Sequence, residues 1–130
     1  MDINWLAVLA ATAASFALGG LWYSPVLFAK PWQRLAGVTD EQVKSSNMAL
    51  LFGGAFVLAL IASAMFAVFL GKQPPLIATG YGLSAGLCWV ATSFGISYLF
   101  ERRPLGLFLI NGGYHTVQFT LIGLILGLWH

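Results

Sequence analysis

The stretch that decides the fold is residues 48–71, with the sequence MALLFGGAFVLALIASAMFAVFLG. It has no charged side chain, and its apolar residues follow one another without the alternation of a half-buried strand. A helix needs roughly 20 apolar residues to cross the hydrocarbon core of a bilayer. Residues 48–71 therefore predict a membrane-spanning helix.

Three further stretches have the same character, and they lie at 3–22, 76–100 and 105–129. Two of the connections between spans are only long enough for a tight turn, which favours antiparallel neighbours. We expect an all-α membrane protein, a single transmembrane domain over residues 1–130, in which four spans form an antiparallel bundle.

The composition excludes several other classes of protein. The 130 residues are 59% hydrophobic and 8% charged, whereas a soluble domain carries about 25% charged residues. So few charged side chains cannot hydrate the surface of a water-soluble protein. A net charge of +2 is also too small for a basic groove that binds the phosphates of a nucleic acid. We expect the chain to lie in a lipid bilayer and to bind no nucleic acid.

The positive charges are distributed unevenly between the two sides of the predicted bundle. The link after the first span and the link after the third carry all but one of the Lys and Arg residues, namely Lys30, Arg34, Lys44, Arg102 and Arg103. The opposite side has Lys72. Because cytoplasmic loops are enriched in Lys and Arg, we predict cytoplasmic links and both termini outside.

The long link, residues 23–47, mixes aromatic, apolar and cationic side chains, which is typical of a short amphipathic segment in the headgroup layer. Pro31 argues against one helix over the whole link. Thr39 and Gln42 have the spacing of a capping box. We expect the helix that begins at Thr39 to continue directly into the second span.

Small residues recur at helical spacing in every span, and such stripes mark helix interfaces in membranes. They are Ala11, Ser15 and Gly19, then Ala55, Ala59, Ser63 and Ala67, then Gly82, Gly86, Ser93 and Ser97, and finally Gly123 and Gly127. We interpret them as packing within the bundle, while contacts between subunits of a homo-oligomer stay an open alternative.

The fourth span contains the one polar group of side chains at the predicted depth of the bilayer centre. Asn111, His115 and Gln118 share one helix face, and Tyr114 adjoins them. A buried ionisable residue is a candidate functional site, but such residues also join helices by hydrogen bonds. Thr12, Ser15, Thr92 and Ser93 are the partners that the other spans offer.

Enzyme chemistry has little support in the sequence. The spans hold no Asp or Glu, and no nucleophile motif surrounds a serine. Cys88, His115 and His130 cannot converge on one metal site. We therefore expect no cofactor and no metal, and a membrane-embedded enzyme using Tyr114, His115 and Glu101 is the least favoured alternative.

The chain resembles a widespread bacterial family of small four-span membrane proteins known as a domain of unknown function. The residues that carry the resemblance are Asn4-Trp5-Leu6, Gly19-Gly20-Leu21-Trp22-Tyr23-Ser24-Pro25, Phe28, Lys30, Trp32, Phe100-Glu101-Arg102-Arg103 and Asn111-Gly112-Gly113-Tyr114-His115. The resemblance implies the architecture and a bacterial inner membrane, without implying a reaction.

The predicted function is binding or passage of a small molecule, ion or lipid at the polar site of the fourth span. The candidate residues are Asn111, Tyr114, His115 and Gln118, with Trp22 and Tyr23 at the rim. The alternative is a structural or interaction module that forms a homo-oligomer or part of a membrane complex.

Overall fold

A computed structural model describes residues 2–130, in which all regular secondary structure is helical. The elements are α1 (Trp5–Trp22), α2 (Ala29–Ala36), α3 (Asp40–Ser45), α4 (Met48–Leu70), α5 (Pro75–Ala85), a π-helical segment (Gly86–Ala91), α6 (Thr92–Glu101) and α7 (Leu105–Leu128). Four helices are long and apolar enough to cross a membrane, namely α1, α4, α7 and the continuous stretch Pro75–Glu101. The expected all-α class with four such helices is confirmed.

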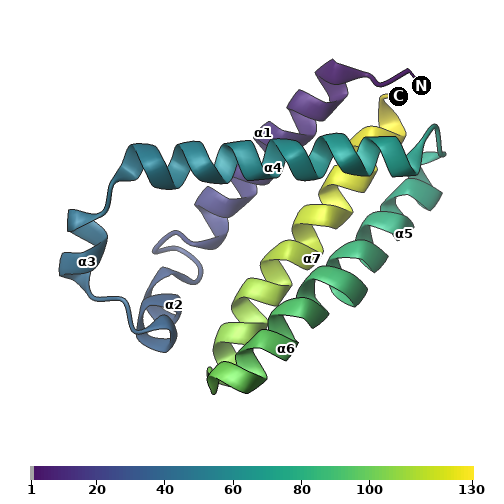
Figure 1. Cartoon of the computed structure of the whole chain (residues 1–130). Helices are drawn as coiled ribbons and strands as arrows, with labels where there is room; N and C mark the ends of the chain where they lie inside the picture. Colours follow the sequence, from purple (N-terminus) through teal and green to yellow (C-terminus); the bar gives the residue numbers. More distant parts are fainter. Residues whose placement is uncertain (1) are drawn as a thin grey trace.

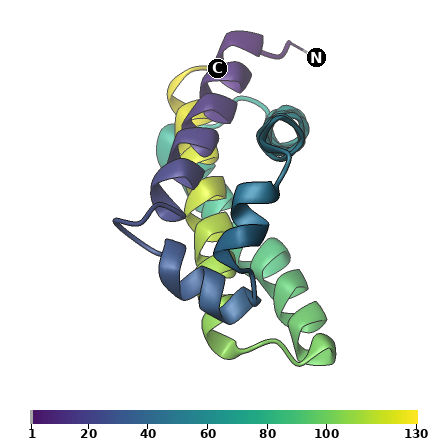
Figure 2. The same cartoon turned by 90° about the vertical axis from the view of Figure 1, so that its left-hand side faces the viewer.

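Helix α7 lies between α1 and α5 and packs against both (Figure 1). Helix α4 crosses this layer steeply, so that it is seen end-on in Figure 2 while the other long helices are seen along their length. Both termini lie at one end of the molecule in both views. Helix α1, helix α7 and the stretch Pro75–Glu101 therefore form one layer, and α4 lies across this layer.

The α5–α7 contact depends on small residues, as their spacing predicts. A Cβ atom added at Gly82 would collide with the backbone carbonyl of Phe119, and one added at Gly86 would lie 2.6 Å from the His115 carbonyl oxygen. Gly123 approaches the carbonyl of Ala78 in the same way. Since lipid supplies no hydrophobic force between helices, this close backbone contact provides van der Waals energy instead.

The stripe predicted in the second span is used only in part. Ser63 and Leu70 are the buried residues of α4, whereas Ala55 is exposed. The reason is the crossing geometry, because a helix that crosses its neighbours steeply contacts them over a short length. The main buried cluster contains Val8 of α1, Ile122 of α7 and, from α4, Leu70 near its C-terminal end.

The long link folds back onto the helices. In α2, Pro31 lies in the first turn, where its missing N–H breaks no helical hydrogen bond. Leu35 packs against the start of α7 at Gly106. The capping box of Thr39 and Gln42 is confirmed.

The expectation that this capped helix continues into the second span is wrong. Helix α3 ends at Ser45, and Ser46 has extended backbone. The Asn47 side chain then accepts a hydrogen bond from the Leu50 N–H and begins α4 as a separate helix. An N-cap residue needs non-helical backbone, so Asn47 favours a break here.

Candidate functional site

Asn111 joins three segments of the chain by hydrogen bonds. The Tyr23 hydroxyl donates to Asn111 Oδ1 over 2.7 Å, and Asn111 Nδ2 donates to the Tyr98 hydroxyl oxygen over 2.8 Å. Tyr23 follows the last residue of α1, and Tyr98 belongs to α6. The amide side chain therefore connects the end of α1, α6 and α7 with both of its polar atoms in use.

Near Asn111, two further hydrogen bonds join α1 to α7. The Trp22 indole N–H donates to the Ile110 carbonyl over 3.0 Å, and the Tyr114 hydroxyl donates to the Ser15 carbonyl over 3.1 Å. A Cβ atom at Gly19 would lie only 3.1 Å from the Tyr114 hydroxyl oxygen. Two of the sequence elements that carry the family resemblance, residues 19–25 and 111–115, are thus in direct contact.

Helix α1 ends here for local reasons. The Tyr23 N–H donates to the Gly19 carbonyl, and the Ser24 hydroxyl donates to the Leu21 carbonyl. Pro25 cannot supply the N–H of a further turn. This stop leaves the Tyr23 side chain free to turn toward α7.

Tyr23 is a neutral hydrogen-bond donor in this position. Burial is the main cause that raises the pKa of the Tyr23 hydroxyl above its usual range, and the nearby Tyr114 and Tyr98 hydroxyls raise it further. A phenol held in its protonated form can donate to the amide oxygen of Asn111 at any physiological pH.

His115 lies between aromatic rings. Its imidazole stacks on Phe94 with ring centroids 5.1 Å apart and planes inclined by 12°, and it contacts the edge of Tyr114 at 4.8 Å. His115 Nδ1 is 2.7 Å from Gln118 Oε1. Because an amide oxygen accepts only, the neutral imidazole carries its proton on Nδ1 and offers Nε2 as an acceptor. Within residues 2–130, no hydrogen bond reaches Nε2.

An open hollow of about 470 Å³ lies next to Phe94, the residue on which His115 stacks. Its wall consists of Trp89, Val90, Ser93, Phe94 and Ser97. Phe94 belongs both to this wall and to the stack on His115. The arrangement places an apolar surface with exposed serines beside a half-buried hydrogen-bond acceptor.

The π-helical segment Gly86–Ala91 forms part of the same region. Gly86 packs against the backbone of His115 and Thr116, and Trp89 enters the wall of the hollow. A π-helical turn contains one residue more than an α-helical turn and often occurs at functional sites. Here it lies between the part of the span that packs on α7 and the part that lines the hollow.

The structure brings the predicted candidates into one region but not into one hydrogen-bonded set. Asn111 bonds Tyr23 and Tyr98, while His115 bonds Gln118, which is 5% exposed. Trp22 and Tyr23 both contact the ring of Tyr114, at 6.4 and 5.5 Å between centroids.

The expectation that hydroxyl side chains of the other spans bond the polar residues of the fourth span is wrong. Thr12, Thr92 and Ser93 donate to carbonyl groups of their own helices. The Ser15 hydroxyl is buried without a partner among residues 2–130. Short hydroxyl side chains in helices readily bond the carbonyl one turn earlier, so they are poor candidates for contacts between helices.

Tyr98 and Phe94 are the site residues that sequence reasoning missed. Tyr98 bonds Asn111, and Phe94 stacks on His115. The available signal was the tight connection between α6 and α7, since residues on the two sides of such a hairpin lie at similar depth. The glycine-rich packing of α5 on α7 could then have fixed which pairs meet.

Glu101 does not join the site. Its carboxylate pairs with Arg103 at 3.4 Å in the exposed turn after α6. Within the described residues 2–130, no group of at least three His, Cys, Asp or Glu side chains is placed to hold a metal ion. What the site offers chemically is neutral hydrogen bonding and aromatic surface.

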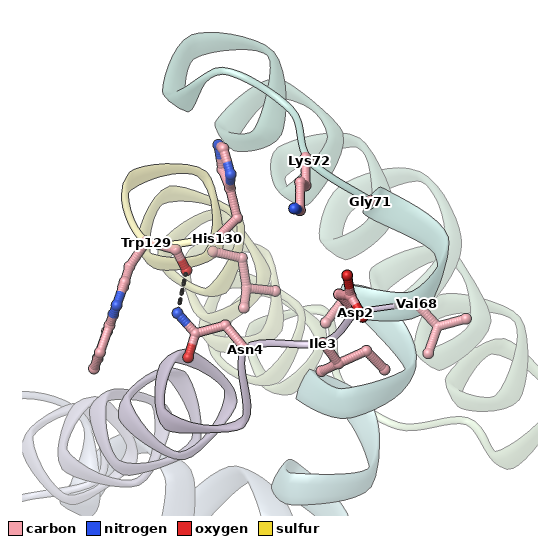
Figure 3. A pocket seen from close by; sticks show the side chains of 10 residues that line it. Asp2, Ile3, Asn4, Val68, Gly71, Lys72, Trp129 and His130 are labelled. Carbon is pink, nitrogen blue, oxygen red and sulfur yellow. Dashed lines mark hydrogen bonds between the residues drawn. The ribbon is translucent and has the colours of Figure 1, made fainter.

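A second hollow, of about 160 Å³, lies at the end that holds the two termini. Figure 3 shows Asn4, Lys72, Trp129 and His130 around it, with the Asn4 amide donating to the Trp129 carbonyl. None of the predicted site residues lines it. It is therefore separate from the region around His115.

The four long apolar helices and the polar residues held between them define the class, an all-helical protein with the architecture of a membrane protein. The family model described as protein of unknown function (DUF1761) matches residues 6–127, and the chain belongs to this family. The resemblance noted from the sequence is confirmed. No curated protein and no solved structure matches the chain.

Proposed function

We propose that this protein binds a neutral, lipid-soluble molecule with a hydroxyl or amide head at the hollow beside His115. The carrying observation is that His115 Nε2 is an acceptor without a partner among residues 2–130, next to Phe94 in the wall of the hollow. A ligand hydroxyl or amide N–H would pair this acceptor, which is favourable because unpaired polar groups are costly in lipid.

The charge of the surroundings supports a neutral ligand. Helices α1, α4, α5 and α7 and the π-helical segment contain no Asp, Glu, Lys or Arg, and the one such residue of α6 is Glu101 at its end. A charged ligand in this region would lack a counter-ion, which is costly at low dielectric constant. The apolar body of a neutral ligand would contact Trp89 and Phe94, and its head would donate to the imidazole.

We place the protein in the bacterial inner membrane with both termini outside. The support is the distribution of cations, since Lys30, Arg34 and the turn at 102–103 all lie at the end away from the termini. Reporter fusions at each terminus test this orientation. A cytoplasmic reporter signal at either terminus would contradict it.

Photolabelling tests the binding proposal. The probe is a long-chain alcohol that carries a diazirine, added to the full chain in lipid nanodiscs. We expect label on the peptide that contains Trp89 and Phe94. His115→Phe keeps an aromatic ring but removes the acceptor, and one lost hydrogen bond of about 1.4 kcal/mol predicts roughly tenfold less labelling.

Two controls make this result specific. Leu109→Phe alters a residue of the same helix that is 60% exposed, and we expect it to leave the labelling unchanged. The methyl ether of the probe cannot donate a hydrogen bond and should label as weakly as His115→Phe. Equal labelling by alcohol and ether would contradict the proposal.

A second candidate function is that of an interaction module. It is favoured by α4, a helix of 23 residues in which only Ser63 and Leu70 are buried. A helix this exposed offers a surface to a second copy or to another membrane protein. Crosslinking in native membranes between cysteines placed on α4 separates this candidate from a monomeric binding protein.

A further inference from the structure

Helix α2 is docked against the start of α7. A Cβ atom at Gly106 would lie 2.7 Å from Leu35 Cδ1, so a larger residue here would require the leucine side chain to shift. The Trp32 ring meets Tyr23 at 5.9 Å on the same inward face of α2. Lys30 and Arg34, one helical turn apart, are exposed on the other side.

The turn between α6 and α7 adds two further cations at this end. Arg102 and Arg103 are exposed and lie directly before α7, on which α2 is docked. Figures 1 and 2 both place α2 and this turn at the end of the molecule away from the termini. Four cations thus gather here with two nearby carboxylates. Glu101 pairs with Arg103 at 3.4 Å on the surface, and Asp40 accepts a hydrogen bond from Gln33 of α2 over 3.0 Å.

The backbone of Arg102 is a second, independent observation. Arg102 has a φ of 58° and is the one residue other than glycine with positive φ among residues 2–130. This left-handed conformation ends α6 and is normally occupied by glycine or asparagine. A residue other than glycine in this conformation costs free energy, and such residues cluster at functional sites.

We infer that α2 and the α6–α7 turn together bind the phosphate of an anionic phospholipid. Docking two positively charged segments against each other is unfavourable by itself, and a phosphate between them removes the repulsion. Trp22 and Tyr23 lie beside α2 and Trp32 belongs to it, and such aromatic side chains mark the headgroup level of a bilayer. Arginine in particular pairs with phosphate through parallel hydrogen bonds.

Native mass spectrometry of the full chain tests this inference. The probes are phosphatidylglycerol and phosphatidylcholine with the same acyl chains, and inorganic phosphate. We expect phosphatidylglycerol to remain bound under conditions that remove phosphatidylcholine. Each cation near a membrane surface contributes about 1 kcal/mol, so Arg34→Gln and Arg102→Asn should each weaken phosphatidylglycerol binding about fivefold.

The substitutions are chosen so that a folding defect cannot explain the result. Asparagine tolerates the left-handed backbone at residue 102, and Arg34 is exposed. Lys72→Gln removes one exposed charge at the opposite end and should leave binding unchanged. Equal retention of the two lipids, an equal effect of Lys72→Gln, or inorganic phosphate replacing the lipid at equal concentration would each overturn the inference.

Discussion

Replacing Asn111 with leucine removes the hydrogen bonds that join the end of α1, α6 and α7, while it keeps the branching and the number of heavy atoms of the side chain. The two bonds, 2.7 and 2.8 Å long, run to Tyr23 and Tyr98. Side-chain hydrogen bonds between membrane helices average about 0.6 kcal/mol, with a maximum of about 1.7 kcal/mol. We therefore expect Asn111→Leu to lower the free energy of unfolding by about 1.2 kcal/mol, with an upper bound of about 3.4 kcal/mol.

Unfolding by sodium dodecyl sulfate in mixed micelles, followed by tryptophan fluorescence, measures this loss. Tyr23→Phe removes one of the two bonds and should lower the free energy by about 0.6 kcal/mol. In a double-mutant cycle, the two substitutions should couple by a similar amount, because both abolish the same contact. Leu109→Ala, on the exposed face of α7, is the matched control and should change little.

The reasoning is refuted if Asn111→Leu unfolds at the wild-type detergent concentration, or if its effect adds to that of Tyr23→Phe without coupling. Either result would mean that the Tyr23–Asn111 contact contributes nothing in the membrane. A loss of stability with the expected coupling would assign Asn111 to the packing of the helices. The proposed ligand would then have His115 as its one hydrogen-bonding partner in the fourth span.

Two further predictions concern packing and pH. Gly82→Val should destabilise the fold by about 1–3 kcal/mol in the same unfolding assay, because its side chain meets the Phe119 carbonyl and the helices must separate; wild-type stability would contradict the α5–α7 contact. The raised pKa of Tyr23 predicts stability that is constant below its unfolded value of 10.0 and falls as the pH rises above it, since unfolding favours the ionised phenol. Unfolding midpoints between pH 8 and pH 11 check this, and Tyr23→Phe should fall less steeply.

The packing of α5 on α7 could be predicted because its signal is local. Gly82 and Gly86 are one helical turn apart, as are Gly123 and Gly127, and small residues at that spacing permit close contact whatever the rest of the fold. The capping box at Thr39 was readable for the same reason. Hydrogen bonds and contacts within one or two turns need no knowledge of the tertiary structure.

The course of α4 could not be read from the sequence. A residue such as Phe56 or Leu58 is equally apolar whether it faces lipid or another helix, so the pattern shows a span without showing its neighbours. The partners of Asn111 and His115 depend on the register of the hairpin between α6 and α7. That register depends on which backbone groups of α7 the α5 glycines meet, and the spacing of the glycines does not specify this.

The wide helical turn at Gly86–Ala91 changes the direction in which side chains point between the two halves of one span. Before it, Gly82 keeps its backbone against α7, and after it, Phe94 is rotated toward the imidazole of His115. A relative with one residue fewer in this turn would retain the glycine crossing but would carry a different side chain opposite the histidine. A change of a single residue in length can thus alter the lining of the hollow, while the scaffold that holds it stays the same.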